Sequence, residues 1–140
     1  MAQRVSDDAD EGESRSKVAE AWPGLIVEDS GFVALPMALL RLQAKLELTP
    51  TDFGVLANIL AHRWKAGDVV FPRTTTIAKR MGVTVRTVQR STTKLAKLGY
   101  IEKVITTNGM RAYDATPLVG KLKALMPEAR EIKSGESLGA

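Results

Sequence analysis

The stretch that decides the fold runs from Phe71 to Tyr100 and reads FPRTTTIAKRMGVTVRTVQRSTTKLAKLGY. Three apolar residues at helical spacing give its first half one apolar side: Ile77, Ala78 and Met81. Gly82 supplies the backbone freedom that ends a first helix, and Thr84 can cap the next one. The stretch therefore predicts two short helices joined by a glycine turn, the first over residues 74–81 and the second over Thr84–Leu98.

A β-hairpin is expected directly after the second helix. Leu98 and Gly99 stop that helix, and residues 100–105 (YIEKVI) predict a strand with apolar side chains at alternate positions. Asn108-Gly109 offers the two left-handed residues of a type I′ turn, after which residues 110–113 can return as the partner strand. Helix, turn, helix and hairpin in this order predict a winged helix-turn-helix, whose wing is the hairpin Tyr100–Tyr113.

Further helices are predicted before this motif. Pro36 suits the first turn of a helix that reaches about residue 46. Thr49, Pro50 and Asp52 have the pattern of a capped helix start, which predicts a helix to about residue 65. Its buried side is expected to carry four large residues: Phe53, Leu56, Leu60 and Trp64. Residues 68–71 are then expected to form a short strand that pairs with the wing.

One more helix is predicted after the wing. Thr116 can cap it, Pro117 suits its first turn, and Pro127 ends it. Five large apolar residues lie along it: Leu118, Val119, Leu122, Leu125 and Met126. A small domain covers only part of such a stripe, so we expect this helix to supply a homodimer contact. The alternative is that Leu118 and Leu122 pack within the chain itself.

Composition along the chain predicts three regions. Residues 1–20 are rich in Asp, Glu, Ser and Arg and hold few large apolar residues, so we expect a disordered acidic arm. Residues 21–127 form the winged helix-turn-helix domain with its flanking helices, and residues 128–140 form a flexible tail. The predicted fold class is mainly α with a small β-hairpin, a winged helix-turn-helix with extra N-terminal and C-terminal helices.

Charge is unevenly spread along the chain, although the net charge is only +4. Residues 1–31 hold eight acidic and three basic residues, whereas residues 61–113 hold eleven basic and two acidic ones. A run of Lys and Arg is often only a solvated helix face, but here it coincides with a helix-turn-helix. The segment therefore predicts a surface for a polyanion, with double-stranded DNA as the partner.

The sequence argues against catalysis and against a bound metal or cofactor. It has no cysteine, and its one histidine, His62, has no neighbour at ligand spacing. Neither of the phosphate-binding patterns GxxxxGK and GxGxxG occurs. No apolar run approaches the roughly 18 residues of a membrane span, and the first residues are acidic, unlike those of a signal peptide. We therefore expect a cytoplasmic, nucleoid-associated protein that is not an enzyme.

The second helix of the motif is expected to lie in the major groove of DNA. Its core side carries Val88 and Leu95, with Ser91 or Thr92 beside them. From the opposite side we expect base contacts by four residues: Arg86, Thr87, Gln89 and Arg90. Arginine can donate two hydrogen bonds to guanine and glutamine can address adenine, each good pair contributing roughly 1 to 3 kcal/mol of discrimination. Thr87 suits a solvated position at the helix start equally well.

Contacts with the DNA backbone are expected from three places. The start of the first helix attracts anions through its amides, the second helix adds cations, and the wing adds an arginine that can enter a narrow minor groove. The residues concerned are Arg73, Thr74, Thr75, Thr76, Thr93, Lys94, Lys97 and Arg111. Thr74 is also the expected N-cap of the first helix.

Two segments carry a resemblance to a known class of domain. AKRMGVTVRTVQR, followed by KLAKLGYIEK, resembles the winged helix-turn-helix domains of bacterial, plasmid and phage regulators and replication-associated proteins. The flanks LTPTDFGVLANIL and YDATPLVGKLKAL extend the resemblance over residues 31–127 and are similar to mobile-element proteins. The resemblance implies a sequence-specific double-stranded DNA-binding protein that regulates transcription, with its wing on the backbone or in the minor groove.

Two other functions fit the same domain. One is an accessory DNA-binding protein in the replication, partition or excision of a plasmid or mobile element, which assembles on repeated sites. The other is a winged helix that serves only protein interaction, for which the exposed side of the second helix would be apolar or acidic. Arg86, Gln89 and Arg90 oppose this last interpretation.

Overall fold

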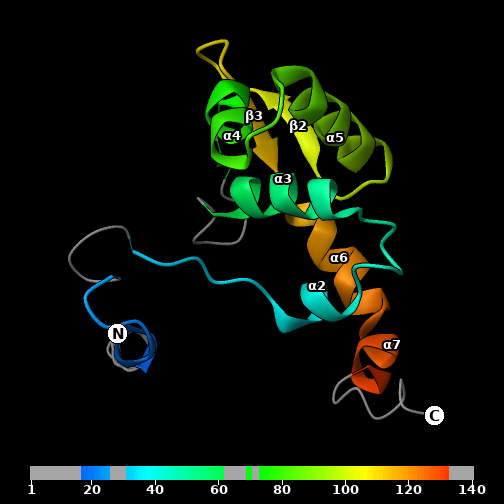
Figure 1. Cartoon of the computed structure of the whole chain (residues 1–140). Coiled ribbons are helices and arrows are strands. Elements are labelled where there is room, and N and C mark those ends of the chain that lie inside the picture. The colour runs from blue at the N-terminus through cyan, green and yellow to red at the C-terminus, as the bar shows by residue number, and fades with distance from the viewer. Residues whose placement is uncertain (1–16, 26–30, 62–68, 71–72, 133–140) are drawn as a thin grey trace, which may run out of the picture. The chain divides into compact units, whose positions relative to one another are not determined.

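The computed structural model describes residues 17–25, 31–61, 69–70 and 73–132. The chain divides into two compact units, Met1–Ala34 and Leu35–Ala140. In the first unit residues 17–21 are helical, so a helix occupies the end of the segment for which disorder is expected. All helices and strands described below belong to the second unit (Figure 1).

The second unit begins with a helix that is shorter than predicted. α2 (Met37–Arg41) starts after Pro36 as expected, but it ends well before residue 46. The side-chain amide of Gln43 donates a hydrogen bond of 2.9 Å to the Leu40 carbonyl, which is the acceptor that a continuing helix would use. Glu47, with φ at 59°, then turns the chain toward the next helix.

α3 (Pro50–Leu60) confirms the predicted capped start. The Thr49 hydroxyl accepts from the Asp52 N–H at 3.1 Å, and the Asp52 carboxylate accepts from the Thr49 N–H at 3.0 Å. Four apolar residues of this helix are buried: Val55, Leu56, Ile59 and Leu60. Phe53 is half-buried, while Trp64, His62 and the predicted continuation to residue 65 lie outside the described residues.

The two helices of the motif follow as predicted. They are α4 (Thr74–Met81) and α5 (Val85–Lys97). Gly82 ends α4 in the left-handed conformation, with φ at 68°, and the Thr84 hydroxyl caps α5 by accepting from the Thr87 N–H at 3.2 Å.

The predicted cap of α4 is wrong. Thr74 is already the first helical residue, because the chain is still extended at Arg73, which occupies the N-cap position. Arg73 has no hydroxyl or carboxylate with which to accept from the first turn, so the residue at the N-cap position forms no side-chain cap. The N–H groups of the first turn of α4 are therefore left without a side-chain acceptor from the cap residue.

The wing is part of a three-stranded antiparallel sheet. β2 (Glu102–Ile105) pairs with β3 (Arg111–Asp114), and β1 (Val69–Val70) pairs with the other side of β3, giving the order β1-β3-β2. This arrangement confirms the expected pairing of the short strand with the wing.

The first residues of the wing do not alternate as predicted. Tyr100 and Ile101 are both buried before β2 begins, whereas Ile105 is 75% exposed. The reason lies in the end of α5, where Gly99 at φ 82° turns the chain and the Tyr100 N–H donates to the Leu95 carbonyl at 3.0 Å. This turn directs two consecutive side chains into the core.

The expected type I′ turn at the wing tip is also wrong. Gly109 is left-handed, with φ at 77°, but Asn108 is not. The Gly109 N–H donates to the Thr106 carbonyl at 2.8 Å, and the Thr106 N–H donates to the Met110 carbonyl at 3.0 Å. These bonds close a three-residue loop with a single left-handed glycine, which is the next most common hairpin connection.

Two helices, rather than one, follow the wing. The cap of α6 (Thr116–Ala124) is Ala115 instead of Thr116, and the Asp114 carboxylate accepts from the Thr116 N–H at 2.9 Å. Pro127 does not end a helix but stands in the first turn of α7 (Met126–Glu131), where its missing N–H costs no helical hydrogen bond. α7 packs against α2 and occupies positions for which a flexible tail is expected.

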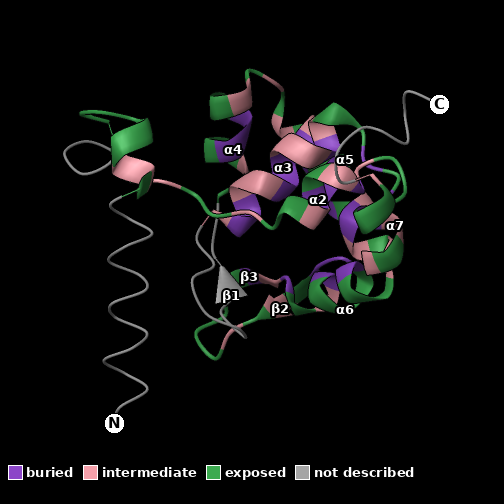
Figure 2. Ribbon diagram, turned by 90° about the horizontal axis from the view of Figure 1, so that it is seen from below, coloured by how far each residue is buried: buried purple, intermediate pink, exposed green. Residues whose placement is uncertain are grey.

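The core joins all of these helices. Its fully buried large residues come from α2, α3, α4 and α5 and from the turn after α2: Leu39, Leu42, Leu46, Val55, Leu56, Ile59, Ile77, Val88 and Leu95. Figure 2 shows buried residues on each of these helices and on α6. Leu118 and Leu122 of α6 are 3% and 7% exposed and belong to this core, so these two side chains are not available for a homodimer contact.

The fold class is confirmed. The unit is mainly helical, with a small antiparallel sheet after the helix pair and extra helices on both sides, which is a winged helix-turn-helix.

Candidate nucleic-acid interface

α5 has a buried side and an exposed basic side. The buried side consists of Val88, Ser91, Thr92 and Leu95. Four exposed residues lie opposite at helical spacing, and we call them the recognition face: Arg86, Arg90, Thr93 and Lys97. Gln89 is exposed at the edge of this face. The predicted base contacts Arg86, Gln89 and Arg90 therefore stand on the solvent side of one helix, and α5 carries no acidic residue.

Thr87 is placed differently from the other predicted base contacts. It is half-buried, its N–H donates to the Thr84 hydroxyl, and the two threonine hydroxyl oxygens are 3.0 Å apart. These bonds favour the role at the helix start, so a base contact by Thr87 stays a prediction.

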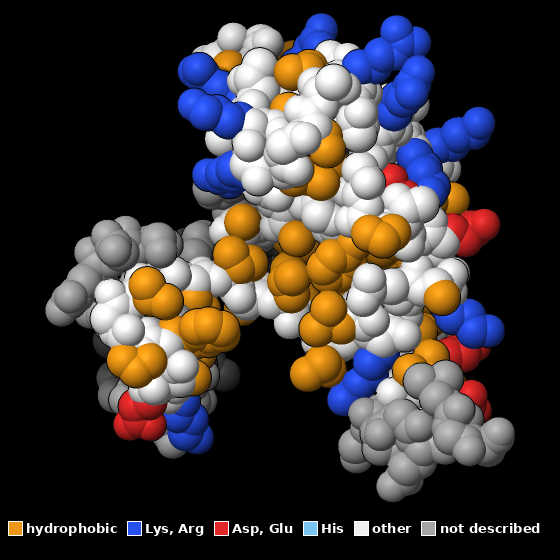
Figure 3. Space-filling view, in the orientation of Figure 1, with side chains coloured by type: hydrophobic (Ala, Val, Ile, Leu, Met, Phe, Trp, Pro, Cys, Tyr) orange, Lys and Arg blue, Asp and Glu red, His pale blue; other side chains and the backbone are white. Residues whose placement is uncertain are grey.

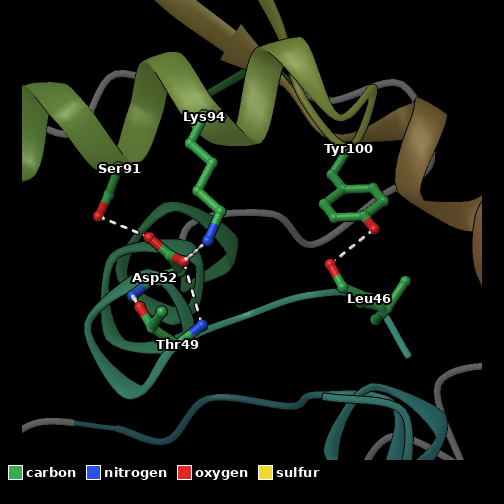
Figure 4. A network of polar contacts seen from close by, with 6 residues as sticks. All are labelled: Leu46, Thr49, Asp52, Ser91, Lys94 and Tyr100. Atoms are coloured by element: carbon green, nitrogen blue, oxygen red, sulfur yellow. Dashed lines mark hydrogen bonds and ion pairs between the residues drawn. The ribbon is translucent and has the colours of Figure 1, made fainter. Parts of the chain in front are cut away.

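A buried carboxylate holds α5 from the core side. Asp52 is 4% exposed; its Oδ1 accepts from the Ser91 hydroxyl at 2.9 Å, and its Oδ2 accepts from the Lys94 ammonium at 2.6 Å (Figure 4). The same Oδ2 accepts from the Thr49 N–H. One side chain thus caps α3 and anchors α5 through two residues that are nearly one turn apart. We use the name Asp52 network for Thr49, Asp52, Ser91 and Lys94.

Asp52 is ionised in the fold. Its burial raises the pKa of the carboxyl, but hydrogen bonds from Lys94, from the Thr49 backbone and from Ser91 together outweigh burial, so the pKa lies below its ordinary value. The negative charge also stands in the first turn of α3, where the helix dipole favours it. The fold therefore stabilises the charged form of Asp52.

The Asp52 network changes the interpretation of Lys94. The sequence predicts a backbone contact from this residue, but its ammonium forms an ion pair within the fold and its side chain is only 39% exposed. A phosphate would have to compete with a carboxylate at 2.6 Å. We therefore assign Lys94 to the anchoring of α5 rather than to DNA.

A second buried hydrogen bond fixes the end of α5. The Tyr100 hydroxyl donates to the Leu46 carbonyl at 2.8 Å (Figure 4). Burial of Tyr100, with the charge of Glu47 nearby, raises the pKa of this phenol and keeps it in the donating form. The Asp52 network and Tyr100 therefore hold α5 in its middle and just beyond its end.

The start of α4 offers a second group of predicted contacts. Arg73, Thr75 and Thr76 are exposed, and Thr74 is half-buried. Because Arg73 at the N-cap position forms no side-chain cap, the first-turn N–H groups of α4 and the neighbouring hydroxyls suit an anion. The Arg80 guanidinium donates to the Asn58 side-chain carbonyl at 3.2 Å and links α4 to α3.

The wing extends the recognition face. The Lys103 ammonium lies 3.5 Å from the Thr93 hydroxyl, so the first strand of the wing meets α5 at this point. Arg111 is exposed and stands opposite Ile105 in the sheet. Lys103 was absent from the predicted contacts, because helical spacing gives no information about a residue on a strand. Figure 3 shows Lys and Arg side chains gathered over α4 and α5.

The described residues show neither a metal site nor a membrane segment. Within them, no group of three or more His, Asp or Glu side chains could hold a metal ion. None of their helices combines the length and the apolar composition needed to cross a membrane.

A comparison with protein families agrees with this geometry. Residues 46–101 match the family model described as a helix-turn-helix domain. The matched range contains α3, α4 and α5 and ends before the strands of the wing. The chain therefore contains a helix-turn-helix domain, and a domain of this class suggests DNA binding. No curated protein matches the chain.

Proposed function

We propose that this protein is a sequence-specific double-stranded DNA-binding protein that regulates transcription. The observation that carries the proposal is the recognition face, with three cations on the exposed side of a helix whose other side is locked into the core. A rigid helix with a charged outer side suits the major groove, because base readout requires side chains held in a fixed register. Binding rather than catalysis is the proposed activity.

In this proposal, base recognition comes from the N-terminal half of α5. Arg86 and Arg90 address guanine, and Gln89 at the edge of the face addresses adenine. Backbone contacts come from the start of α4, from the C-terminal half of α5 and from the wing. They comprise Arg73, Thr75, Thr76, Thr93, Lys97, Lys103 and Arg111, all of which are exposed.

We further propose that the protein acts as a homodimer on the nucleoid. One recognition helix reads few base pairs, whereas two copies on half-sites about 34 to 36 Å apart would double the contacts. The surface for this contact lies elsewhere than Leu118 and Leu122, which are buried in the core. Sedimentation velocity of the free protein and of its complex with DNA measures the stoichiometry, and one copy per site would contradict this part.

The experiment compares variants on two kinds of duplex. One is a duplex selected by the wild-type protein from a random pool, and the other is a duplex of scrambled sequence, both measured at one fixed salt concentration. Arg86→Ala and Arg90→Ala are each expected to lower discrimination between the two by roughly 5- to 150-fold, which corresponds to about 1 to 3 kcal/mol. Arg73→Ala is expected to weaken both complexes similarly.

Lys123→Ala provides the matched control. Lys123 is an exposed cation on α6, outside the recognition face, so its removal changes the net charge equally. It should leave discrimination unchanged. Equal discrimination by wild type, Arg86→Ala and Arg90→Ala would contradict the assignment of α5 as the reading helix.

A further inference from the structure

The wing tip carries two large apolar side chains that the fold does not use. Ile105 is 75% exposed and Met110 is 54% exposed, and Ile105 is the most exposed large hydrophobic residue among the described ones. Ile105 is the last residue of β2 and Met110 directly precedes β3, and between them lie Thr106 and the three-residue loop 107–109. Neither belongs to the hydrophobic core or to the residues packed against it.

Turn formation does not require these apolar side chains. The loop is closed by backbone bonds between Thr106 and Gly109 and between Thr106 and Met110, and the Thr106 hydroxyl accepts from the Met110 N–H at 3.2 Å. Polar residues at positions 105 and 110 would satisfy the same geometry. Exposed apolar side chains at the tip of a hairpin that projects beyond α4 therefore indicate a surface that becomes covered by a partner (Figure 1).

The surroundings of Ile105 identify the chemistry of this partner. Directly opposed residues of an antiparallel pair share one side of the sheet, so Ile105 lies on the same side as Arg111. Lys103, two residues before Ile105, also lies on this side and reaches Thr93 of the recognition face. The two acidic residues of the strands, Glu102 and Asp114, oppose each other on the other side. Ile105, flanked by Arg111 and Lys103, thus continues the surface proposed to bind DNA, while Met110 stands at the end of the hairpin beside it.

We propose that the wing tip inserts Ile105 and Met110 into the minor groove as an apolar wedge and bends the bound DNA. The inference rests on the proposed DNA binding of the recognition face. The minor groove is only about 6 Å wide, so a hairpin tip with two large side chains enters it by opening it and partly unstacking a base step. Arg111, which stands opposite Ile105 in the sheet, would contact the adjacent DNA backbone while the apolar side chains leave water.

The experiment measures the bend directly. A duplex of about 30 base pairs, selected by the wild-type protein from a random pool, carries a donor and an acceptor dye at its ends, and energy transfer reports their separation. Wild-type protein is expected to bend this duplex by about 20 to 90°. Ile105→Ser with Met110→Ser should remove most of the bend and weaken binding roughly tenfold, since the lost contacts are apolar.

Two comparisons separate a wedge from other roles of the tip. Arg111→Ala should reduce the dependence of binding on salt by about one phosphate contact, whereas the double serine variant should leave it unchanged, because serine replaces no charge. Met37→Ser is the matched control, since Met37 is 57% exposed on α2, away from the wing, and its loss should not affect the bend. All variants should melt near the wild-type temperature because the changed residues are exposed.

Four results would overturn the inference. A duplex that stays straight with wild-type protein, or one that is bent equally by the double serine variant, rejects the wedge while leaving DNA binding intact. A change in the sedimentation of the free protein on the double substitution would assign the tip to contact between copies of the chain instead. A wild-type protein that selects no sequence and binds no duplex at low salt rejects the proposed function, and with it the wedge.

Discussion

Replacing Asp52 by alanine tests whether one buried carboxylate positions the recognition helix. The substitution removes the acceptor of three bonds, from the Thr49 N–H at 3.0 Å, the Ser91 hydroxyl at 2.9 Å and the Lys94 ammonium at 2.6 Å. Because the pKa of Asp52 is lowered in spite of its burial, the charged form is more stable in the fold than in the unfolded chain. Its removal should therefore destabilise the protein.

The magnitude follows from the separate contacts. Loss of a helix cap costs about 0.5 to 2 kcal/mol, and loss of a buried bond to a charged group costs about 1.5 to 3 kcal/mol. The ion pair adds only about 0 to 1 kcal/mol, since solvent reaches the Lys94 side chain. The substitution also removes the cost of burying a charge, which offsets part of these losses, so we expect the free energy of unfolding to fall by about 2 to 4 kcal/mol in total. For a domain of this size that lowers the melting temperature by roughly 10 to 25 °C.

Thermal unfolding followed by circular dichroism measures this effect. Glu102→Ala is the control, because Glu102 is an exposed carboxylate on β2 and its loss should change the free energy of unfolding by less than about 0.5 kcal/mol. At a temperature where Asp52→Ala is still folded, its affinity for the selected duplex should fall more than its affinity for a scrambled one. A melting temperature within about 3 °C of wild type would refute the anchoring role.

Three further predictions concern pH and backbone conformation. First, because the pKa of Asp52 is lowered in the fold, its contribution to stability is present above the pKa of the unfolded chain, about 4, and is lost as the pH falls through the pKa of the folded protein. The difference in melting temperature between wild type and Asp52→Asn should therefore shrink below about pH 4. An unchanged difference down to about pH 2 would contradict this. Second, Tyr100→Phe should cost about 1 to 2 kcal/mol at neutral pH, since it leaves the Leu46 carbonyl without its donor. The pKa of Tyr100 is raised in the fold, so this stabilisation is complete below the pKa of the unfolded chain, about 10, and is lost as the pH rises through the pKa of the folded protein. Denaturant titrations at neutral pH in which Tyr100→Phe is as stable as wild type would reject the stabilising role of this hydrogen bond. Third, Gly82→Ala should destabilise by about 1 to 2 kcal/mol because φ is 68°, whereas Gly120→Ala in α6 should stabilise by about 0.5 to 1 kcal/mol. An added Cβ meets no atom within 4 Å at either glycine, so equal effects in the two variants would show that backbone conformation is not the cause.

The sequence by itself determined the features that depend on neighbours a few residues apart. The apolar spacing of α4, the left-handed Gly82, the cap at Thr84 and the capping box of Thr49 and Asp52 are all local signals, and each is confirmed. The exposed side of α5 could be predicted for the same reason, because helical spacing assigns its buried and solvent sides. Local signals failed where two of them competed, as at Pro127, which suits the first turn of a helix as well as the end of one.

Only the tertiary structure decided how these pieces hold one another. Asp52 meets Ser91 and Lys94 across 39 and 42 residues, and Tyr100 reaches Leu46 across 54 residues, distances over which residue spacing carries no information. The same holds for Lys103, which joins the recognition face only because β2 passes beside α5. Burial decided these roles, since a carboxylate enclosed by the fold must find hydrogen-bond donors, and only the packing of helices shows which donors are there.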